Sequence, residues 1–355
     1  MRDVSVATAS FSTRDRIETR LARTLMSLPM PAIRALAGKP ITRDGRVLDP
    51  QAQVAILSAK RAGKKPGYAL DLAAGRRDMD ISGRQLGPRP SELAWEENRM
   101  LAGLPVRFYR PRGIAKGGPA LMYLHGGGFT SGSLESHDLV CQAIAAETPC
   151  TVCAVDYRLA PEHRFPAAAD DATKVFRAMV SDADVLRIDP ARIAVGGDSA
   201  GGNLAAVVAL DTRGDAVRPC FQMLIYPTVD MTMSFPSIDI FDRGFFLEKE
   251  SIRWYRGNYL GHDASDGQKR DPRASPWFAE DLSGLPKALV VTAGFDPLRD
   301  EGDAYAKRLA DAGVDVQHES YGSLFHGFWN TTGIIHASRA AFDDAIRALR
   351  IALAI

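Results

Sequence analysis

Residues 192–210 read RIAVGGDSAGGNLAAVVAL. The first six residues form an apolar run typical of a buried strand, and the last eight form a helical run, so the glycine-rich segment between them predicts a tight strand-to-helix turn. This turn contains G-x-S-x-G, with Ser199 between Gly197 and Gly201. A serine at such a turn adopts strained backbone angles, and the glycines remove Cβ atoms that would collide there. The stretch therefore predicts a serine nucleophile presented at the edge of a sheet.

Two structural alternatives also fit a glycine-rich turn, namely close packing alone and a phosphate-binding loop. A Walker loop places a Lys after its last glycine, whereas Asn203 follows the glycines here. The strand-turn-helix context favours the nucleophile, and the packing alternative stays open at this point.

A second glycine-rich segment, HGGGF at residues 125–129, follows the apolar run ALMYL. Consecutive glycines let backbone N–H groups turn toward one point, as an oxyanion hole requires. The glycine spacing departs from the G-x-G-x-x-G of dinucleotide-binding loops. The segment therefore predicts donors for a developing negative charge.

An acid and a base follow later in the chain. Asp296 comes directly after the apolar run ALVVTAGF, at the carboxyl end of an expected strand. Asp300 is expected to lie in the next helix and to form a structural ion pair. Of the seven histidines, His326 alone lies in a loop after the last expected strand and is followed by a permissive glycine, Gly327. The order Ser199, Asp296, His326 is the serine, acid, histidine order of α/β-hydrolases.

Strand and helix patterns alternate from residue 105 onward, which predicts an α/β fold with a mainly parallel sheet covered by helices on both faces. The expected strands are residues 105–110, 120–126, 151–157, 192–197, 221–227, 287–294 and 315–321. The expected helices are residues 139–147, 168–180, 200–210, 303–312 and 338–354.

Two segments break this alternation. Residues 1–100 show helical periodicity at 16–36 and 51–61 with no convincing strand, and are interpreted as a helical segment that contributes to a cap. Residues 230–275 are rich in aromatic side chains, with helical character near 248–260, and are interpreted as a cap insertion. The core is then divided into residues 101–229 and 276–355.

Composition excludes several classes of protein. The chain has 355 residues, with 44 basic against 43 acidic side chains, and a balance without a block of like charge predicts neither nucleic acid nor an anionic membrane surface as partner. Four cysteines are too few for a disulfide framework, and Cys150 and Cys153 are interpreted as buried, inert thiols. The charged N-terminus and the lack of a long apolar run predict no signal peptide and no membrane span, hence a cytoplasmic protein.

The sequence resembles the hormone-sensitive lipase family of serine esterases, the bacterial group called type IV, which has the α/β-hydrolase fold with a helical cap. The matching blocks are HGGGF at 125–129, DYRLAPEHRFPAAADD at 156–171, GDSAGGN at 197–203 and DPLRDEG at 296–302. ITRDGRVLDPQAQ at 41–53 is similar to the family's cap segment.

The resemblance implies a residue-by-residue assignment of roles. It places the catalytic nucleophile, acid and base on Ser199, Asp296 and His326. The oxyanion hole falls on the backbone N–H groups of Gly127, Gly128 and Ala200. It further implies that four polar side chains near the site are structural and that Asp198 is not a second catalytic acid; the four are His125, Asp156, Arg158 and Glu162.

The implied reaction is hydrolysis of short- to medium-chain carboxylic esters through an acyl-enzyme, without metal or organic cofactor. Phe129, Phe245 and Phe246 are candidate walls of the substrate pocket. Relatives often pair through an edge strand, so the resemblance is compatible with a homodimer, although no sequence feature demands one. Two alternatives stay open. One keeps the triad and acts on amides, lactones or carbamates, since the histidine protonates an amine as readily as an alcohol. The other is a non-catalytic ligand-binding protein, like the hormone receptors of this fold, which lack the triad histidine.

Overall fold

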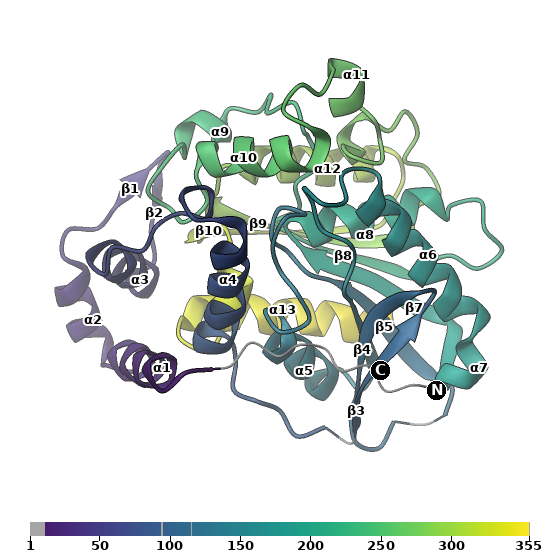
Figure 1. Ribbon diagram of the computed structural model, residues 1–355, viewed down its shortest axis with the longest axis horizontal. Coiled ribbons are helices and arrows are strands. Elements are labelled where there is room, and N and C mark those ends of the chain that lie inside the picture. The colour runs from purple at the N-terminus through teal and green to yellow at the C-terminus, as the bar shows by residue number, and fades with distance from the viewer. Residues whose placement is uncertain (1–10, 94, 115, 355) are drawn as a thin grey trace.

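The computed structural model describes residues 11–93, 95–114 and 116–354 (Figure 1). Its centre is an eight-stranded sheet in the order β10-β9-β8-β7-β5-β6-β4-β3. The strands are β3 Trp95–Leu101, β4 Leu104–Arg110, β5 Gly118–Leu124, β6 Thr151–Val155, β7 Ile188–Asp198, β8 Phe221–Ile225, β9 Lys287–Phe295 and β10 Val316–Phe325. Neighbours from β10 to β6 are parallel, whereas β4 pairs antiparallel with both β6 and β3. The expected mainly parallel sheet is confirmed.

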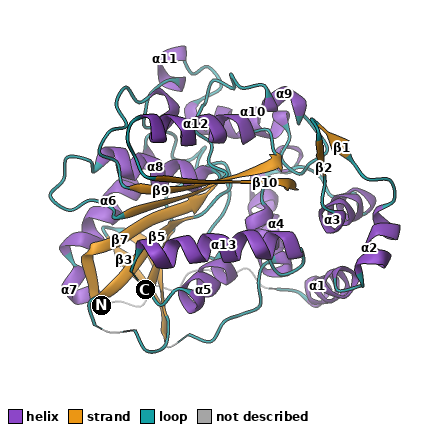
Figure 2. Ribbon diagram, turned by 180° about the vertical axis from the view of Figure 1, so that it is seen from behind, coloured by secondary structure: helices purple, strands orange, loops and turns teal. Residues whose placement is uncertain are grey.

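Helices cover both faces of this sheet (Figures 1 and 2). The longer core helices are α5 Asp138–Glu147, α6 Ala167–Ser181, α8 Ala200–Asp211, α12 Arg299–Asp311 and α13 His336–Ala352. Along β5, Met122 and Leu124 join the cluster of α6, α8 and α12, while Leu121 and Tyr123 join that of α5 and α13. Because successive side chains of a strand point to opposite faces, this alternation places one apolar core on each side of the sheet.

The N-terminal part of the chain forms a separate layer at one side of the sheet (Figures 1 and 2). It comprises α1 Thr13–Met26, α2 Met30–Ala37, the short hairpin β1 Thr42–Arg43 and β2 Arg46–Val47, α3 Pro50–Arg61, η1 Gly67–Ala69 and α4 Leu72–Leu86. The expectation that the first hundred residues hold no strand is wrong, since the hairpin and the start of β3 lie there. β3 reads WEENRML and is an edge strand with one neighbour, so it lacks the apolar run by which the buried strands are identified.

The segment 230–275 lies above the sheet and contains α9 Ser237–Ile240, α10 Lys249–Leu260 and α11 Asp266–Lys269. It contacts the N-terminal layer, because Arg43 Nη1 donates to Ile240 O at 3.0 Å and the Arg43 guanidinium lies over the Phe245 ring. The remaining elements are α7 Ala183–Leu186, η2 Pro276–Phe278 and η3 Phe328–Thr331. No helix among the described residues is long and apolar enough to cross a membrane.

The cysteines carry free thiols, and Cys150 and Cys153 are both buried. Burial raises the pKa of the Cys150 thiol to about 12 and raises that of Cys153 as well. A thiol that stays protonated at neutral pH is a poor nucleophile and metal ligand. The interpretation of this pair as buried, inert thiols is confirmed.

Candidate active site

Ser199 lies at the junction of β7 and α8, where the strand turns directly into the helix. Its backbone has φ 55° and ψ −118°, in the positive-φ region that residues other than glycine rarely adopt. A Cβ on Gly197 or Gly201 would stand 2.2 or 1.9 Å from Leu124 O. The strained turn and its need for both flanking glycines are therefore confirmed.

His326 connects Ser199 to Asp296 at the carboxyl ends of three parallel strands. Its Nε2 lies 2.9 Å from Ser199 Oγ, and its Nδ1 lies 2.7 Å from Asp296 Oδ2. The Asp296 carboxylate is fully buried, and its other oxygen accepts the Leu298 N–H at 2.8 Å. With Nδ1–H donating to the carboxylate, Nε2 is free to accept the serine proton. Three side chains up to 127 residues apart thus form one hydrogen-bonded line.

The HGGG loop presents two backbone donors beside this line. Gly127 has φ 122° and Gly128 has φ 61°, angles that suit glycine. Within the described residues neither N–H donates a hydrogen bond to the protein. Both glycines line the same cavity as Ser199 and His326. Ala200 is not among the residues that line it, but as the first residue of α8 its N–H has no acceptor within the helix. The geometry suits a ligand oxygen that carries negative charge.

Asp198 joins the serine turn to the HGGG loop. Its Oδ1 accepts the Gly126 N–H at 3.0 Å and the Tyr123 hydroxyl at 2.8 Å, and it lies 3.1 Å from His137 Nε2. Burial alone would raise the pKa of Asp198, but the imidazole of His137 and these hydrogen bonds lower it overall. An ionised, fully bonded carboxylate here positions the loop, consistent with the expectation that Asp198 is not a second acid.

His125 also supports the HGGG loop, through a contact with the loop backbone and a stacked ring. Its Nδ1 lies 2.8 Å from Gly126 O, and its ring stacks on Tyr157 with centroids 4.2 Å apart. Burial lowers the pKa of His125 to about 3, so the imidazole is neutral at physiological pH. It does not line the cavity, as expected for a structural side chain.

The polar block that follows β6 also lies outside the cavity. Arg158 forms a bidentate pair with Asp171, and Glu162 pairs with Arg76 of α4. Asp156 is largely buried, and this burial raises its pKa to about 6. The ion pairs hold helices to the loop, in agreement with the structural interpretation of the block.

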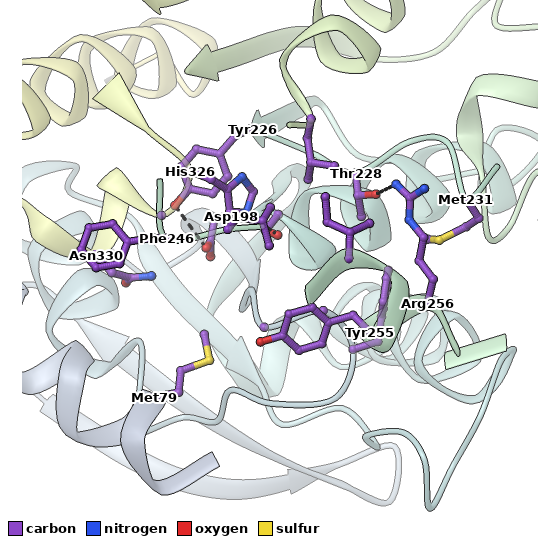
Figure 3. Close-up of a pocket in the computed structure, with 18 residues that line it drawn as sticks. Met79, Asp198, Tyr226, Thr228, Met231, Phe246, Tyr255, Arg256, His326 and Asn330 are labelled. Carbon is purple, nitrogen blue, oxygen red and sulfur yellow. Dashed lines mark hydrogen bonds between the residues drawn. The ribbon is translucent and has the colours of Figure 1, made fainter. Parts of the chain in front are cut away.

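The cavity above Ser199 has a volume of about 210 Å³ (Figure 3). Phe246 and Asn330 lie toward one end and Met231 and Arg256 toward the other, with His326 between them. Besides these, Ser199 and the two HGGG glycines, the lining consists of Met79, Phe129, Asp198, Tyr226, Thr228, Leu247, Ile252, Tyr255, Leu298 and Gly327.

Of the three candidate wall residues, Phe129 and Phe246 line the cavity and Phe245 does not. The prediction for Phe245 is therefore wrong. Its side chain is 3% exposed and packs on Phe241 and Phe295 in the core. Phe246, with φ 66°, turns the other way and contacts Phe325, because neighbouring residues on an irregular segment point in different directions.

Sequence reasoning missed most of the cavity wall. Tyr255 packs so closely on the HGGG loop that a Cβ on Gly128 would stand 2.3 Å from its ring. The spacing of Ile252, Tyr255 and Arg256 on one face of α10 is a signal that could have identified this wall. Met79 comes from α4, for which no helix was expected, so its position depends on tertiary packing.

A buried ion pair closes the end of the cavity beyond Met231. Arg256 donates to Thr228 Oγ1 at 3.3 Å and to Glu301 Oε2 at 3.4 Å. Glu301 Oε1 also accepts the Val229 N–H at 2.7 Å. Burial raises the pKa of Glu301 to about 7, although Arg256 opposes this shift. Ionisation of Glu301 is therefore costly in the folded protein.

Known proteins share this arrangement of chain and fold. A family described as having the alpha/beta hydrolase fold matches residues 121–330. The chain is 42% identical over 338 residues to the carboxylic ester hydrolase LipN of Mycobacterium tuberculosis, covering 91% of this chain and 88% of that protein. It belongs to the hormone-sensitive lipase family of α/β-hydrolases.

Further relatives of this esterase agree. It is 37% identical to the ethyl acetate hydrolase of Pseudomonas putida, covering 82% of this chain and 94% of that protein. The solved ester hydrolase EH1AB1 from the Lake Arreo metagenome superposes with a TM-score of 0.81 and 39% identity, covering 87% and 100% of the two chains. The esterase is a carboxylic ester hydrolase, and the ligand-binding alternative is set aside.

Proposed function

We propose that Ser199, His326 and Asp296 are the catalytic triad of this carboxylesterase, which acts by acyl transfer. The observation that carries the proposal is the continuous line of contacts at 2.9 and 2.7 Å, which lies in the cavity beside the N–H groups of Gly127 and Gly128. His326 removes the hydroxyl proton as Ser199 Oγ attacks the ester carbonyl carbon, and Asp296 stabilises the imidazolium that forms.

The carbonyl oxygen becomes an oxyanion and receives the N–H groups of Gly127, Gly128 and Ala200. When the C–O bond to the alcohol breaks, His326 gives its proton to the leaving oxygen, and an acyl-enzyme remains on Ser199. Water then attacks the acyl carbon with His326 again as base, which releases the acid and restores the serine. Each oxyanion donor of this kind contributes about 10²- to 10³-fold in rate.

The proposed substrates are short- to medium-chain esters, since the cavity of about 210 Å³ is lined mainly by apolar and aromatic side chains. We further propose that the N-terminal layer and segment 230–275 act together as its lid. Met79 of α4 and Tyr255 of α10 support this, because each comes from one of the two segments and both line the cavity.

Hydrolysis of 4-nitrophenyl butyrate by Ser199→Ala tests the triad. The expected loss in kcat is about 10⁴-fold or more, with an unchanged melting temperature. Near-native turnover by this variant contradicts the proposal. A matched butyranilide distinguishes the ester from the amide alternative, because an amidase with the same triad hydrolyses both at comparable rates.

A further inference from the structure

The outer surface of α1 exposes apolar side chains. Ile17 is 56% exposed and Leu21 64%, and their spacing of four residues places them on one face of the helix. Leu28, just beyond the C-terminal end of α1, is 37% exposed. Leu36 of α2 is 44% exposed. Five of the nine large hydrophobic side chains exposed in the described residues fall between residues 17 and 47. Solvent-exposed apolar side chains gathered in this way indicate an interaction surface.

Basic side chains flank this apolar face. Arg16 and Arg20 lie one helical position from Ile17 and Leu21, and neither forms an ion pair with any described residue. The two acids of the helix are occupied elsewhere: Asp15 caps its own helix at Ser12, and Glu18 pairs with Arg14. We call Arg16, Ile17, Arg20, Leu21 and Leu28 the α1 surface.

The charge of the surrounding segment is strongly asymmetric. Residues 11–70 contain twelve Lys and Arg against four Asp and Glu, although the whole chain has a net charge of +1. The rest of the chain is therefore net negative. The net charge of the whole chain, from which an anionic membrane partner was not expected, hides this asymmetry. The fold reveals it, because the basic segment forms one layer at the edge of the molecule (Figure 1).

We propose that the α1 surface docks this protein on an anionic phospholipid membrane. Ile17, Leu21 and Leu28 would enter the boundary between headgroups and acyl chains, while Arg16 and Arg20 pair with lipid phosphates. An anionic membrane contacts both the exposed apolar side chains and the basic side chains of the α1 surface. A symmetric dimer through α1 would bring like charges together, and nucleic acid would leave the apolar side chains exposed.

The α1 surface is connected to the substrate cavity through one intervening helix. α1 packs on α4, and α4 supplies Met79 to the cavity wall. The surface itself stands apart from the proposed triad, because none of its residues lines the cavity. Membrane binding can therefore be measured without depending on turnover.

Co-sedimentation of the full-length protein with vesicles tests the proposal. Binding is expected to vesicles of phosphatidylcholine with phosphatidylglycerol, to weaken at high salt, and to be at least about tenfold weaker to phosphatidylcholine alone. Arg16→Gln/Arg20→Gln is expected to weaken binding about 30-fold, at roughly one kcal/mol per basic side chain. Ile17→Ser/Leu21→Ser is expected to weaken it by about tenfold or more.

A matched control is available away from α1. Val185 of α7 is 62% exposed and Ile351 of α13 is 80% exposed, and Val185→Ser/Ile351→Ser is expected to bind vesicles as the wild type does. All variants are expected to hydrolyse a soluble short-chain ester at the wild-type rate, which verifies folding. Loss of that activity in the wild type itself would count against the proposed function and not against docking.

Three results would overturn the proposal. One is that the wild-type protein does not bind anionic vesicles, or binds neutral vesicles equally well. The second is unchanged binding by both α1 variants. The third is a different partner for the same surface, seen as a concentration-dependent dimer or a DNA complex that Ile17→Ser/Leu21→Ser or Arg16→Gln/Arg20→Gln abolishes while vesicles do not bind.

Discussion

Replacing Asp198 by Asn tests whether this carboxylate positions the oxyanion loop. The side chains of Asp198 and His137 are 3% and 2% exposed, so their contact is shielded from water. A hydrogen bond to a charged group typically contributes about 1.5–3 kcal/mol. Asparagine keeps one oxygen for Tyr123 and the Gly126 N–H but removes the carboxylate charge, so the expected loss is about 2–3 kcal/mol in the free energy of unfolding.

The same change is expected to lower kcat by about tenfold or more with little effect on KM. The reason is that Gly126 directly precedes the two glycines whose N–H groups face the cavity, and small shifts of an oxyanion donor are costly. Urea unfolding at neutral pH gives the first quantity, and steady-state hydrolysis of 4-nitrophenyl butyrate gives the second.

Tyr226→Phe is the graded control, because of the bonds to this carboxylate it removes the longest, at 3.3 Å, and leaves the others in place. Its expected cost is about 1 kcal/mol or less. The pKa of Asp198 is lowered in the folded protein, so its contribution is present above its ordinary pKa of 3.8 and is lost as the pH falls through the folded-state value. An Asp198→Asn variant with wild-type stability and wild-type kcat would refute the positioning role.

Four further variants distinguish core from cavity, probe the oxyanion loop and test the buried acid. Phe245→Ala is expected to lower the free energy of unfolding in urea by about 3–5 kcal/mol, with KM nearly unchanged. Phe246→Ala is expected to raise KM for a butyrate ester without changing the melting temperature. The reverse pattern would contradict the cavity assignment. Gly128→Ala is expected to lower kcat about 100-fold, since its Cβ would collide with Tyr255, and wild-type kcat would show that the loop can move. Glu301 has a pKa raised to about 7, so the folded state holds its proton more tightly than the unfolded state between pH 4.5 and 7, and wild-type stability falls by up to about 3 kcal/mol as the pH rises through this window. Glu301→Gln lacks that slope, and parallel stability curves for the two proteins would contradict the burial effect.

The buried parallel strands could be predicted from sequence because both of their faces are covered. β5, β6 and β8 are buried at every position and so read as continuous apolar runs. β3 has an antiparallel neighbour on one side and is half-buried or exposed at every position but its last, so its polar sequence gives no such signal. α4 was missed because its buried residues, Gly83 and Gln85, are not apolar.

The residues of the site also differ in how far the sequence predicts their positions. Ser199, Asp296 and His326 follow strand ends in sequence, so topology alone brings them to one edge of the sheet. The cavity wall depends on tertiary packing instead. Phe245 and Phe246 are neighbours of identical type, and only the backbone angles of the folded segment send one into the core and the other to the cavity.

Mass spectrometry after treatment with a fluorophosphonate tests the central claim most directly, because the reagent bonds covalently to an activated serine. The account predicts one adduct per chain, on Ser199, which is absent from Ser199→Ala and formed much more slowly in His326→Ala. An adduct on another residue, or equal labelling of wild type and His326→Ala, would contradict it.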